Sequence, residues 1–182
     1  MAQRTPGIRP RPTLWRTLDA ASRQAFPAAC TALLLLLLAA PLGVPGQAQL
    51  LPAAALACVF FWSLFRPGSM PPPVVFALGL FSDLLSLAPP GLSVLILLLT
   101  HGLAVRWRRV LTGQGFLLVW LAFVAVAAGA AALGWALTSL LTFRLLPGGA
   151  ALFQWALTAG LYPALAPLFI RAHRGLATPE QA

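Results

Sequence analysis

Few side chains in this sequence are capable of chemistry. The carboxylates among its 182 residues are Asp19, Asp83 and Glu180, accompanied by two histidines and one tyrosine. Asp83 lies alone in the apolar stretch FALGLFSDLL (residues 76–85). Paired acid and base catalysis, or a divalent metal site, would need a second acidic group close to it. We therefore expect no enzyme activity, no metal and no cofactor, and Asp83 needs another explanation.

The residues around Asp83 form a stripe of small and polar side chains. Four positions share one helical face at the spacing i, i+3, i+4 and i+7: Gly79, Ser82, Asp83 and Ser86. The other residues of the segment are apolar. Lipid cannot satisfy a polar group, whereas a neighbouring helix can approach small residues closely, so we expect the stripe to face other helices.

Three roles are open for Asp83. The first, which we favour, is a hydrogen-bonding node between helices. The second is a ligand or ion site, and the third is a carboxylate near the outer surface that reaches the lipid headgroups. Counted from the turn at Pro90, His101 lies about 6 Å deeper than Asp83, so direct pairing is not expected. Arg144 is a candidate partner, because its long side chain could extend inward.

The composition indicates where such a helix must lie. Hydrophobic residues make up 60% of the chain and charged residues 8%, which the surface of a soluble domain would not tolerate. The apolar residues come in blocks that suit a hydrocarbon core of about 30 Å. Six blocks are expected to be helices: residues 26–44, 48–65, 73–88, 91–105, 116–141 and 149–170. The predicted fold class is therefore an all-α membrane protein with six transmembrane helices.

The basic residues orient this bundle. All twelve are arginine, and with six crossings every one except Arg144 falls on the side of the two termini. The positive-inside rule then puts both termini in the cytoplasm. We predict a basic cytoplasmic arm over residues 1–25, a transmembrane domain over 26–170 and a cytoplasmic tail over 171–182. Because topology explains the net charge of +9, nucleic-acid binding is not expected.

The start of the chain allows more than one interpretation. Helical spacing of apolar residues in LWRTLDAASRQAF (residues 14–26) suits a helix lying on anionic inner-leaflet lipids. A basic arm that only sets the topology is the alternative. The run AACTALLLLLLAA also resembles the core of a signal peptide, but a further apolar block follows almost at once, so we expect it to be retained as a helix.

The central part of the chain resembles a known family. The run FFWSLFRPGSMPPPVVFALGLFSDLLSLAPPGLSVLILLL is similar to the signature of the rod shape-determining membrane protein MreD family: a tryptophan-containing helix ending in Arg-Pro, a Gly-Leu-x-x-Asp-Leu-Leu helix and a Pro-Gly-Leu turn. RRVLTGQGFLLVWLAF and LYPALAPLF resemble its basic loop and closing helix. The matching positions are Trp62, Arg66, Pro67, Gly79, Asp83, Pro90, Gly91, Tyr162 and Pro163.

This resemblance implies a non-enzymatic, multi-pass scaffold in the bacterial inner membrane that supports peptidoglycan synthesis and rod cell shape. The implied partners are an MreC-like single-pass protein and, in the same elongation complex, MreB, a RodA-type glycosyltransferase and a penicillin-binding transpeptidase. The matching positions, together with Ser82 and Ser86, would serve in helix packing or partner docking.

The same family is similar in fold to the six-helix substrate-binding subunits of energy-coupling-factor transporters. That similarity implies an alternative function, a membrane subunit that captures a small polar molecule from outside. The connections expected on the outer side are PLGVPGQAQ, PPG and RLLPGG, which are short and nearly uncharged. They offer few of the convergent polar groups that hold a ligand, so the scaffold is favoured.

Overall fold

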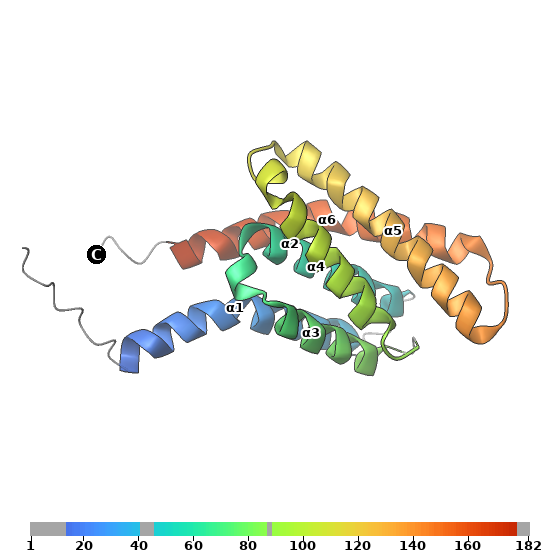
Figure 1. The fold of residues 1–182 in the computed structure, drawn as a ribbon, viewed down its shortest axis with the longest axis horizontal. Coiled ribbons are helices and arrows are strands. Elements are labelled where there is room, and N and C mark those ends of the chain that lie inside the picture. Colours follow the sequence, from blue (N-terminus) through green and yellow to red (C-terminus); the bar gives the residue numbers. More distant parts are fainter. Residues whose placement is uncertain (1–13, 41–45, 87–88, 178–182) are drawn as a thin grey trace, which may run out of the picture.

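The computed structural model describes residues 14–40, 46–86 and 89–177, and all regular structure within them is helical (Figure 1). The elements are α1 (Leu14–Ala39), α2 (Gln47–Phe65), the short 3-10 helix η1 (Pro67–Ser69), α3 (Pro72–Leu85), α4 (Leu92–Leu111), α5 (Phe116–Thr142) and α6 (Gly148–Ala177). The prediction of an all-α fold is confirmed. The predicted arm before residue 14 and the tail after residue 177 lie outside the described residues.

Three helices, α1, α4 and α6, extend beyond the predicted apolar blocks. α1 already begins at Leu14, so residues 14–25, predicted as part of a separate arm, are continuous with the first apolar block. α4 continues to Leu111 and ends with Arg108 and Arg109 in its last turn. Arginine is a good helix former and its charge is favourable at a helix C-terminus, so the helical backbone can continue where the hydropathy falls.

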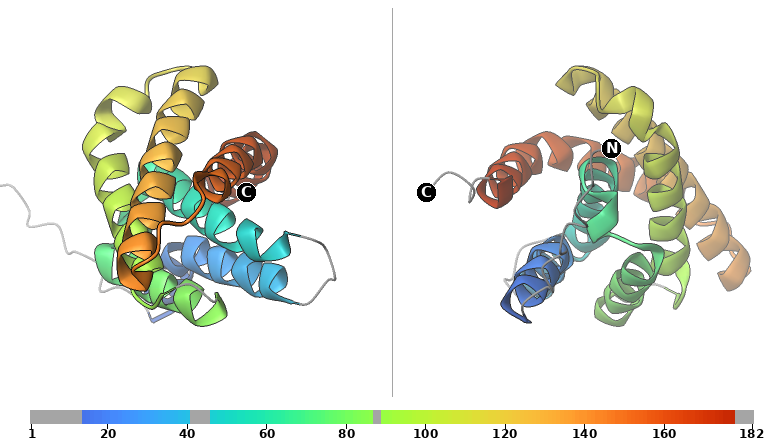
Figure 2. Two further views of the ribbon diagram at one scale, coloured as in Figure 1. Left: turned by 90° about the vertical axis from the view of Figure 1, so that its right-hand side faces the viewer. Right: turned by 60° about the vertical axis from the view of Figure 1, so that its left-hand side comes forward.

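α2 is the central helix of the bundle. Its residues from Ala53 to Leu64 are all buried. It packs against α1, α4 and α6, and Figure 2 shows it surrounded by these helices. A helix with neighbours on several sides has no polar face to present, which explains why the sequence of α2 is apolar all round.

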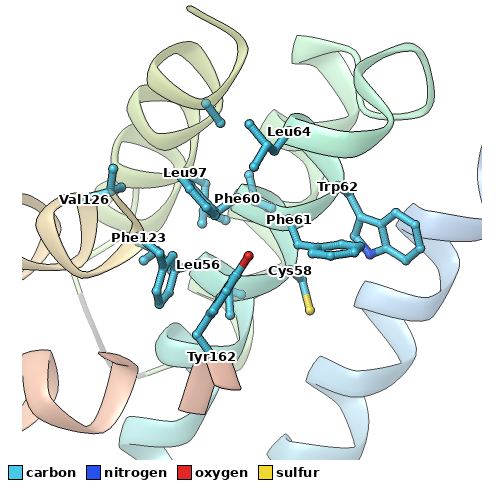
Figure 3. Packing of buried hydrophobic residues seen from close by; sticks show 14 of the residues in the cluster. Leu56, Cys58, Phe60, Phe61, Trp62, Leu64, Leu97, Phe123, Val126 and Tyr162 are labelled. Atoms are coloured by element: carbon cyan, nitrogen blue, oxygen red, sulfur yellow. The ribbon is translucent and has the colours of Figure 1, made fainter. Parts of the chain in front are cut away.

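An aromatic cluster joins α2 to α5 and α6 (Figure 3). The ring of Phe123 stacks on Tyr162 with centroids 4.3 Å apart, and Phe60 meets Phe123 at 5.2 Å. Such pairs contribute about 0.5–1.5 kcal/mol each beyond the burial of their surface. Tyr162 is thus a packing residue of the core, whereas the neighbouring Pro163 is exposed.

Tryptophan side chains also connect α5 and α6. The indole N–H of Trp120 on α5 donates to the carbonyl oxygen of Ala159 on α6 at 3.0 Å. In the other direction, the indole N–H of Trp155 on α6 donates to the carbonyl oxygen of Val124 on α5 at 3.1 Å. Each indole thereby satisfies its polar group while burying its apolar ring, so the two helices are held together by reciprocal bonds.

The outer surface of the bundle is strongly apolar. Large hydrophobic side chains are exposed on α1, α3, α4, α5 and α6, with Leu33 68% and Leu84 77% exposed. Among the described residues, α2 and α5 are long and apolar enough to cross a membrane, α2 being mostly buried and α5 mostly exposed. The apolar segments Gln24–Ala39 and Pro72–Leu85 are shorter.

Candidate functional site at the α3–α4 hairpin

Asp83, near the end of α3, caps the start of α4. Its Oδ2 accepts a hydrogen bond from the backbone N–H of Gly91 at 2.7 Å, and its Oδ1 accepts one from the backbone N–H of Ser93 at 3.0 Å. The first N–H groups of a helix have no partner within the helix, and the positive end of the helix dipole favours a negative charge there. α4 has no capping side chain of its own at Gly91, so Asp83 supplies the cap from the neighbouring helix.

Gly91 adopts the conformation that this cap requires. Its φ is 90°, in the left-handed region that glycine enters without strain. The chain therefore turns sharply between α3 and α4 while the N–H of Gly91 points at the carboxylate. The Pro-Gly-Leu turn read from the sequence is thus a structural part of the Asp83 site, with Pro90 exposed beside it.

Gly79 allows α3 and α4 to approach closely. A Cβ at this position would lie 2.6 Å from the Cα of Val94, a distance that real Cβ atoms essentially never show. The glycine lies one helical turn before Asp83 on the same face. Close approach at Gly79 and hydrogen bonds at Asp83 therefore hold the two helices together at successive turns.

The two serines of the stripe behave differently. Ser86 is half-buried, and its Oγ donates a weak hydrogen bond to the backbone carbonyl of Asp83 at 3.4 Å. Ser82 is fully buried, and its Oγ has no hydrogen-bond partner in the described part of the chain. A buried hydroxyl without a partner costs about 1–3 kcal/mol, so Ser82 is a polar group with free hydrogen-bonding capacity.

Neither side chain considered as a partner for Asp83 contacts it. His101 instead pairs its Nδ1 with the Oγ of Ser63 at 2.8 Å, in the buried contact between α4 and α2. Arg144 is exposed beyond the end of α5, and no ion pair joins it to Asp83 within the residues that the structure describes. The sequence does not reveal the true partners, because backbone amides are present at every non-proline position.

Trp62, Arg66 and Pro67, which also match the MreD signature, lie at the opposite end of the bundle from the hairpin. Trp62 is buried in the last turns of α2, and its carbonyl accepts the backbone N–H of Arg66 at 2.7 Å. Pro67 begins η1 in the connection to α3. These residues shape the α2–α3 connection and do not contribute to the site around Asp83.

A cavity of about 420 Å³ opens beside the hairpin, at the end of the bundle where the α3–α4 and α5–α6 connections lie. Its walls come from α2, α3, α4, α5 and α6, and no charged residue lines it. Small residues of α5, among them Ala127, Ala131 and Gly134, make room for it. The polar side chains in its wall are Gln49, Ser82, Ser86, Ser93, Thr138, Gln154 and Thr158.

Part of this polar wall is already committed to internal hydrogen bonds. The side-chain amide of Gln154 donates to the carbonyl of Gln49 at 3.1 Å, and the hydroxyl of Thr158 donates to the carbonyl of Gln154 at 2.7 Å. Ser82 differs from them because its hydroxyl is buried and unpaired. Because Ser82 is 0% exposed, its hydroxyl lies behind the cavity wall, and the cavity is an apolar recess. Sequence reasoning missed Gln49 and Gln154, for which the signal was an amide side chain in an otherwise apolar helix.

Comparison of the chain with protein-family models, curated proteins and solved structures finds no significant match. Among the described residues, no group of three or more His, Cys, Asp or Glu side chains is placed to hold a metal ion. Cys58 is buried in α2 and Cys30 is half-buried in α1, both as free thiols. The hairpin and the cavity beside it are therefore the features from which a function has to be inferred.

Proposed function

We propose that the protein is a multi-pass scaffold of the bacterial inner membrane, with six transmembrane helices and both termini in the cytoplasm. Support comes from the distribution of exposed apolar side chains, which is not confined to the two longest apolar helices. Leu33 on α1, Leu84 on α3 and Leu95 on α4 are all exposed. A soluble protein rarely exposes apolar patches of this extent, whereas lipid would cover them without cost.

The placement of arginines supports the orientation. Arg66 follows α2, Arg106, Arg108 and Arg109 end α4, and Arg171 lies on the last part of α6. These positions share the end of the bundle at which α1 begins and α6 ends (Figure 1). Arg144 follows α5 at the other end. The positive-inside rule assigns the arginine-rich end to the cytoplasm, so the cavity opens toward the outer side.

The observation that carries the scaffold function is the open, mostly apolar cavity beside the α3–α4 hairpin. An uncharged, open recess at the outer membrane surface suits a mostly apolar peptide segment. We propose that the occupant is the membrane-proximal outer segment of a single-pass partner. The cavity wall offers amides and hydroxyls but no acid, base or activated nucleophile, which fits a binding role.

The resemblance to the MreD family identifies the proposed partner as an MreC-like protein. In this proposal the protein acts in the cell-elongation complex, together with MreB, a RodA-type glycosyltransferase and a penicillin-binding transpeptidase. Its contribution is to hold an MreC-like partner at the outer surface of the membrane, and thereby to support peptidoglycan synthesis and rod shape. This step rests on the sequence resemblance, whereas the docking site rests on the cavity.

Co-purification in mild detergent from the native cell tests this function. The full-length protein is expected to bring along MreC-like and wall-synthase proteins. Gly134→Leu is expected to lose them, because position 134 lines the cavity and a larger side chain there would fill it. Gly102→Leu is the matched control, since a Cβ at the exposed Gly102 would meet nothing within 4 Å and this residue lies outside the cavity. Equal recovery of partners with both variants would contradict docking in the cavity.

A second function is favoured by the size of the cavity. A volume of about 420 Å³ lies within the range of about 300–1,000 Å³ that is typical of small-molecule sites. The alternative is therefore a substrate-binding subunit of an energy-coupling-factor type transporter. Tight binding of a vitamin-like molecule to the purified protein, or co-purification of an ATP-binding transporter module, would establish it in place of the scaffold.

A further inference from the structure

A second hollow lies between α4 and α5. It is a groove of about 430 Å³ that shares Ile96 and Ala130 with the first cavity and extends from them along α4 to Trp107. Its lining is apolar except for Thr100. The α4 wall consists of Ile96, Leu99, Thr100, Leu103 and Trp107, and the α5 wall of Ala125, Val126, Gly129, Ala130 and Leu133.

The groove is open to the outside of the bundle. Leu99, Leu103 and Trp107 are 49%, 39% and 44% exposed, so no described segment of the chain covers them. On the α5 side Gly129 has no side chain to narrow the groove, and an added Cβ there would meet nothing within 4 Å. The groove therefore suits an apolar occupant from outside the described part of the chain.

The length of the groove corresponds to one leaflet of a membrane. Ile96 and Trp107 are eleven positions apart on a helix, which is about 16 Å at 1.5 Å per residue, or about half of a hydrocarbon core of about 30 Å. With the proposed orientation, which this inference adopts, the groove spans the inner leaflet. Trp107 then lies at its cytoplasmic end, at the depth where tryptophan is enriched in membrane proteins.

Two exposed arginines lie in the last turns of α4, next to the groove lining at Trp107. The side chains of Arg106 and Arg109 make no hydrogen bond or ion pair with any described residue. Arg108, by contrast, is held by the hydrogen bond from its Nε to the carbonyl of Leu64 at 3.0 Å. Asp83 is the carboxylate whose side chain the structure describes, and it lies at the opposite end of the bundle. No described carboxylate side chain therefore pairs with these guanidinium groups.

We propose that the groove binds an anionic phospholipid of the inner leaflet. An acyl chain lies along α4 and α5 between Ile96 and Trp107, and the phosphate of the headgroup lies against Arg106 and Arg109. Basic side chains at the cytoplasmic edge of a groove between transmembrane helices recognise such headgroups, and the planar guanidinium can bind two phosphate oxygens at once. The lipid covers an apolar wall that the described residues leave open, and its single negative charge offsets part of the charge of the two arginines.

Mass spectrometry of the purified full-length protein tests this proposal. Micelles containing equal amounts of phosphatidylglycerol and phosphatidylethanolamine are added, and the lipid retained by the protein is counted. We expect preferential retention of phosphatidylglycerol. Arg106→Gln and Arg109→Gln are each expected to lower this retention about fivefold, which corresponds to about 1 kcal/mol for one basic residue near a membrane surface. Arg144→Gln removes the same charge at the other end and should leave retention unchanged.

A second pair of variants tests the groove itself. Gly129→Leu places a side chain in the groove and is expected to reduce retention of phosphatidylglycerol, whereas Gly102→Leu on the exposed surface of α4 is not. Circular dichroism and the elution volume show that each variant is folded. Equal retention of both lipids, or equal losses in test and control variants, would overturn the proposal, as would recovery of a second protein chain cross-linked at position 129.

This experiment separates the lipid site from the proposed function. Extraction of the protein from the membrane fraction, followed by retention without headgroup preference, would refute the lipid site and leave the scaffold unaffected. Recovery of the protein from the soluble fraction would refute the membrane topology and the lipid site together. Loss of partner co-purification in Gly134→Leu, with lipid retention unchanged, would show that the two sites act independently.

Discussion

The Oδ2 of Asp83 accepts the backbone N–H of Gly91 at 2.7 Å, so a carboxylate at the end of α3 closes the start of α4. The same carboxylate binds the N–H of Ser93 through its other oxygen. A charge in an apolar segment is thereby compensated without a basic side chain, because two amides and a helix dipole take that role. The hairpin is a single unit in which each helix depends on the other.

Replacement of Asp83 should measure the strength of this cap. Asp83→Asn keeps an oxygen that can accept one of the two bonds and should lower stability by about 1 kcal/mol. Asp83→Leu leaves both amides without a partner and should cost about 2–4 kcal/mol, although it makes the segment more apolar. Unfolding of the purified protein in detergent checks both values. A leucine variant as stable as the wild type would show that the cap contributes nothing.

Gly79 should tolerate no side chain. Gly79→Ala places a Cβ 2.6 Å from the Cα of Val94, so α3 and α4 must move apart, at a cost of about 1–3 kcal/mol. Gly102→Ala on the exposed face of α4 serves as control, since alanine is the better helix former and its Cβ meets nothing within 4 Å. The unfolding temperature should be lower than that of the wild type for Gly79→Ala, and equal or higher for Gly102→Ala.

The hydrogen bond between Ser63 and His101 should show strong coupling in a double-mutant cycle. Ser63→Ala leaves the buried His101 Nδ1 without its partner at 2.8 Å and should cost about 1–3 kcal/mol. Adding His101→Leu removes the unsatisfied group, so the double variant should be less destabilised than the sum of the single variants. Additive losses in unfolding free energy would show that the bond is not important to stability.

Ser82 should affect stability but not binding. Ser82→Ala removes a buried hydroxyl that has no partner, so the isolated protein should become more stable by about 1 kcal/mol. Ser82 is 0% exposed, so an occupant of the cavity does not reach its hydroxyl, and co-purification of the proposed partner should be unchanged. Unfolding of the isolated protein and quantitative co-purification are measured side by side. A variant that is no more stable than the wild type would show that the hydroxyl has a hydrogen-bond partner.

The sequence by itself determined the helical elements. The predicted blocks 48–65 and 116–141 agree closely with α2 (Gln47–Phe65) and α5 (Phe116–Thr142), because Pro and Gly interrupt the chain at their ends. α1, α4 and α6 were predicted too short because hydropathy marks where a helix is apolar, while the helical backbone continues through arginine-containing turns. Local periodicity also placed Gly79, Ser82 and Asp83 on one face.

Only the tertiary structure decided what that face meets. The partners of Asp83 are backbone amides, which cannot be predicted from residue types because nearly every residue has one. The close approach at Gly79 depends on the shape of α4 at Val94. The cavity likewise brings together Gln49 and Gln154, 105 positions apart in the chain. Helical periodicity is a property of neighbouring residues, whereas the contacts between helices depend on how whole surfaces fit, so the elements could be read from the sequence and the site could not.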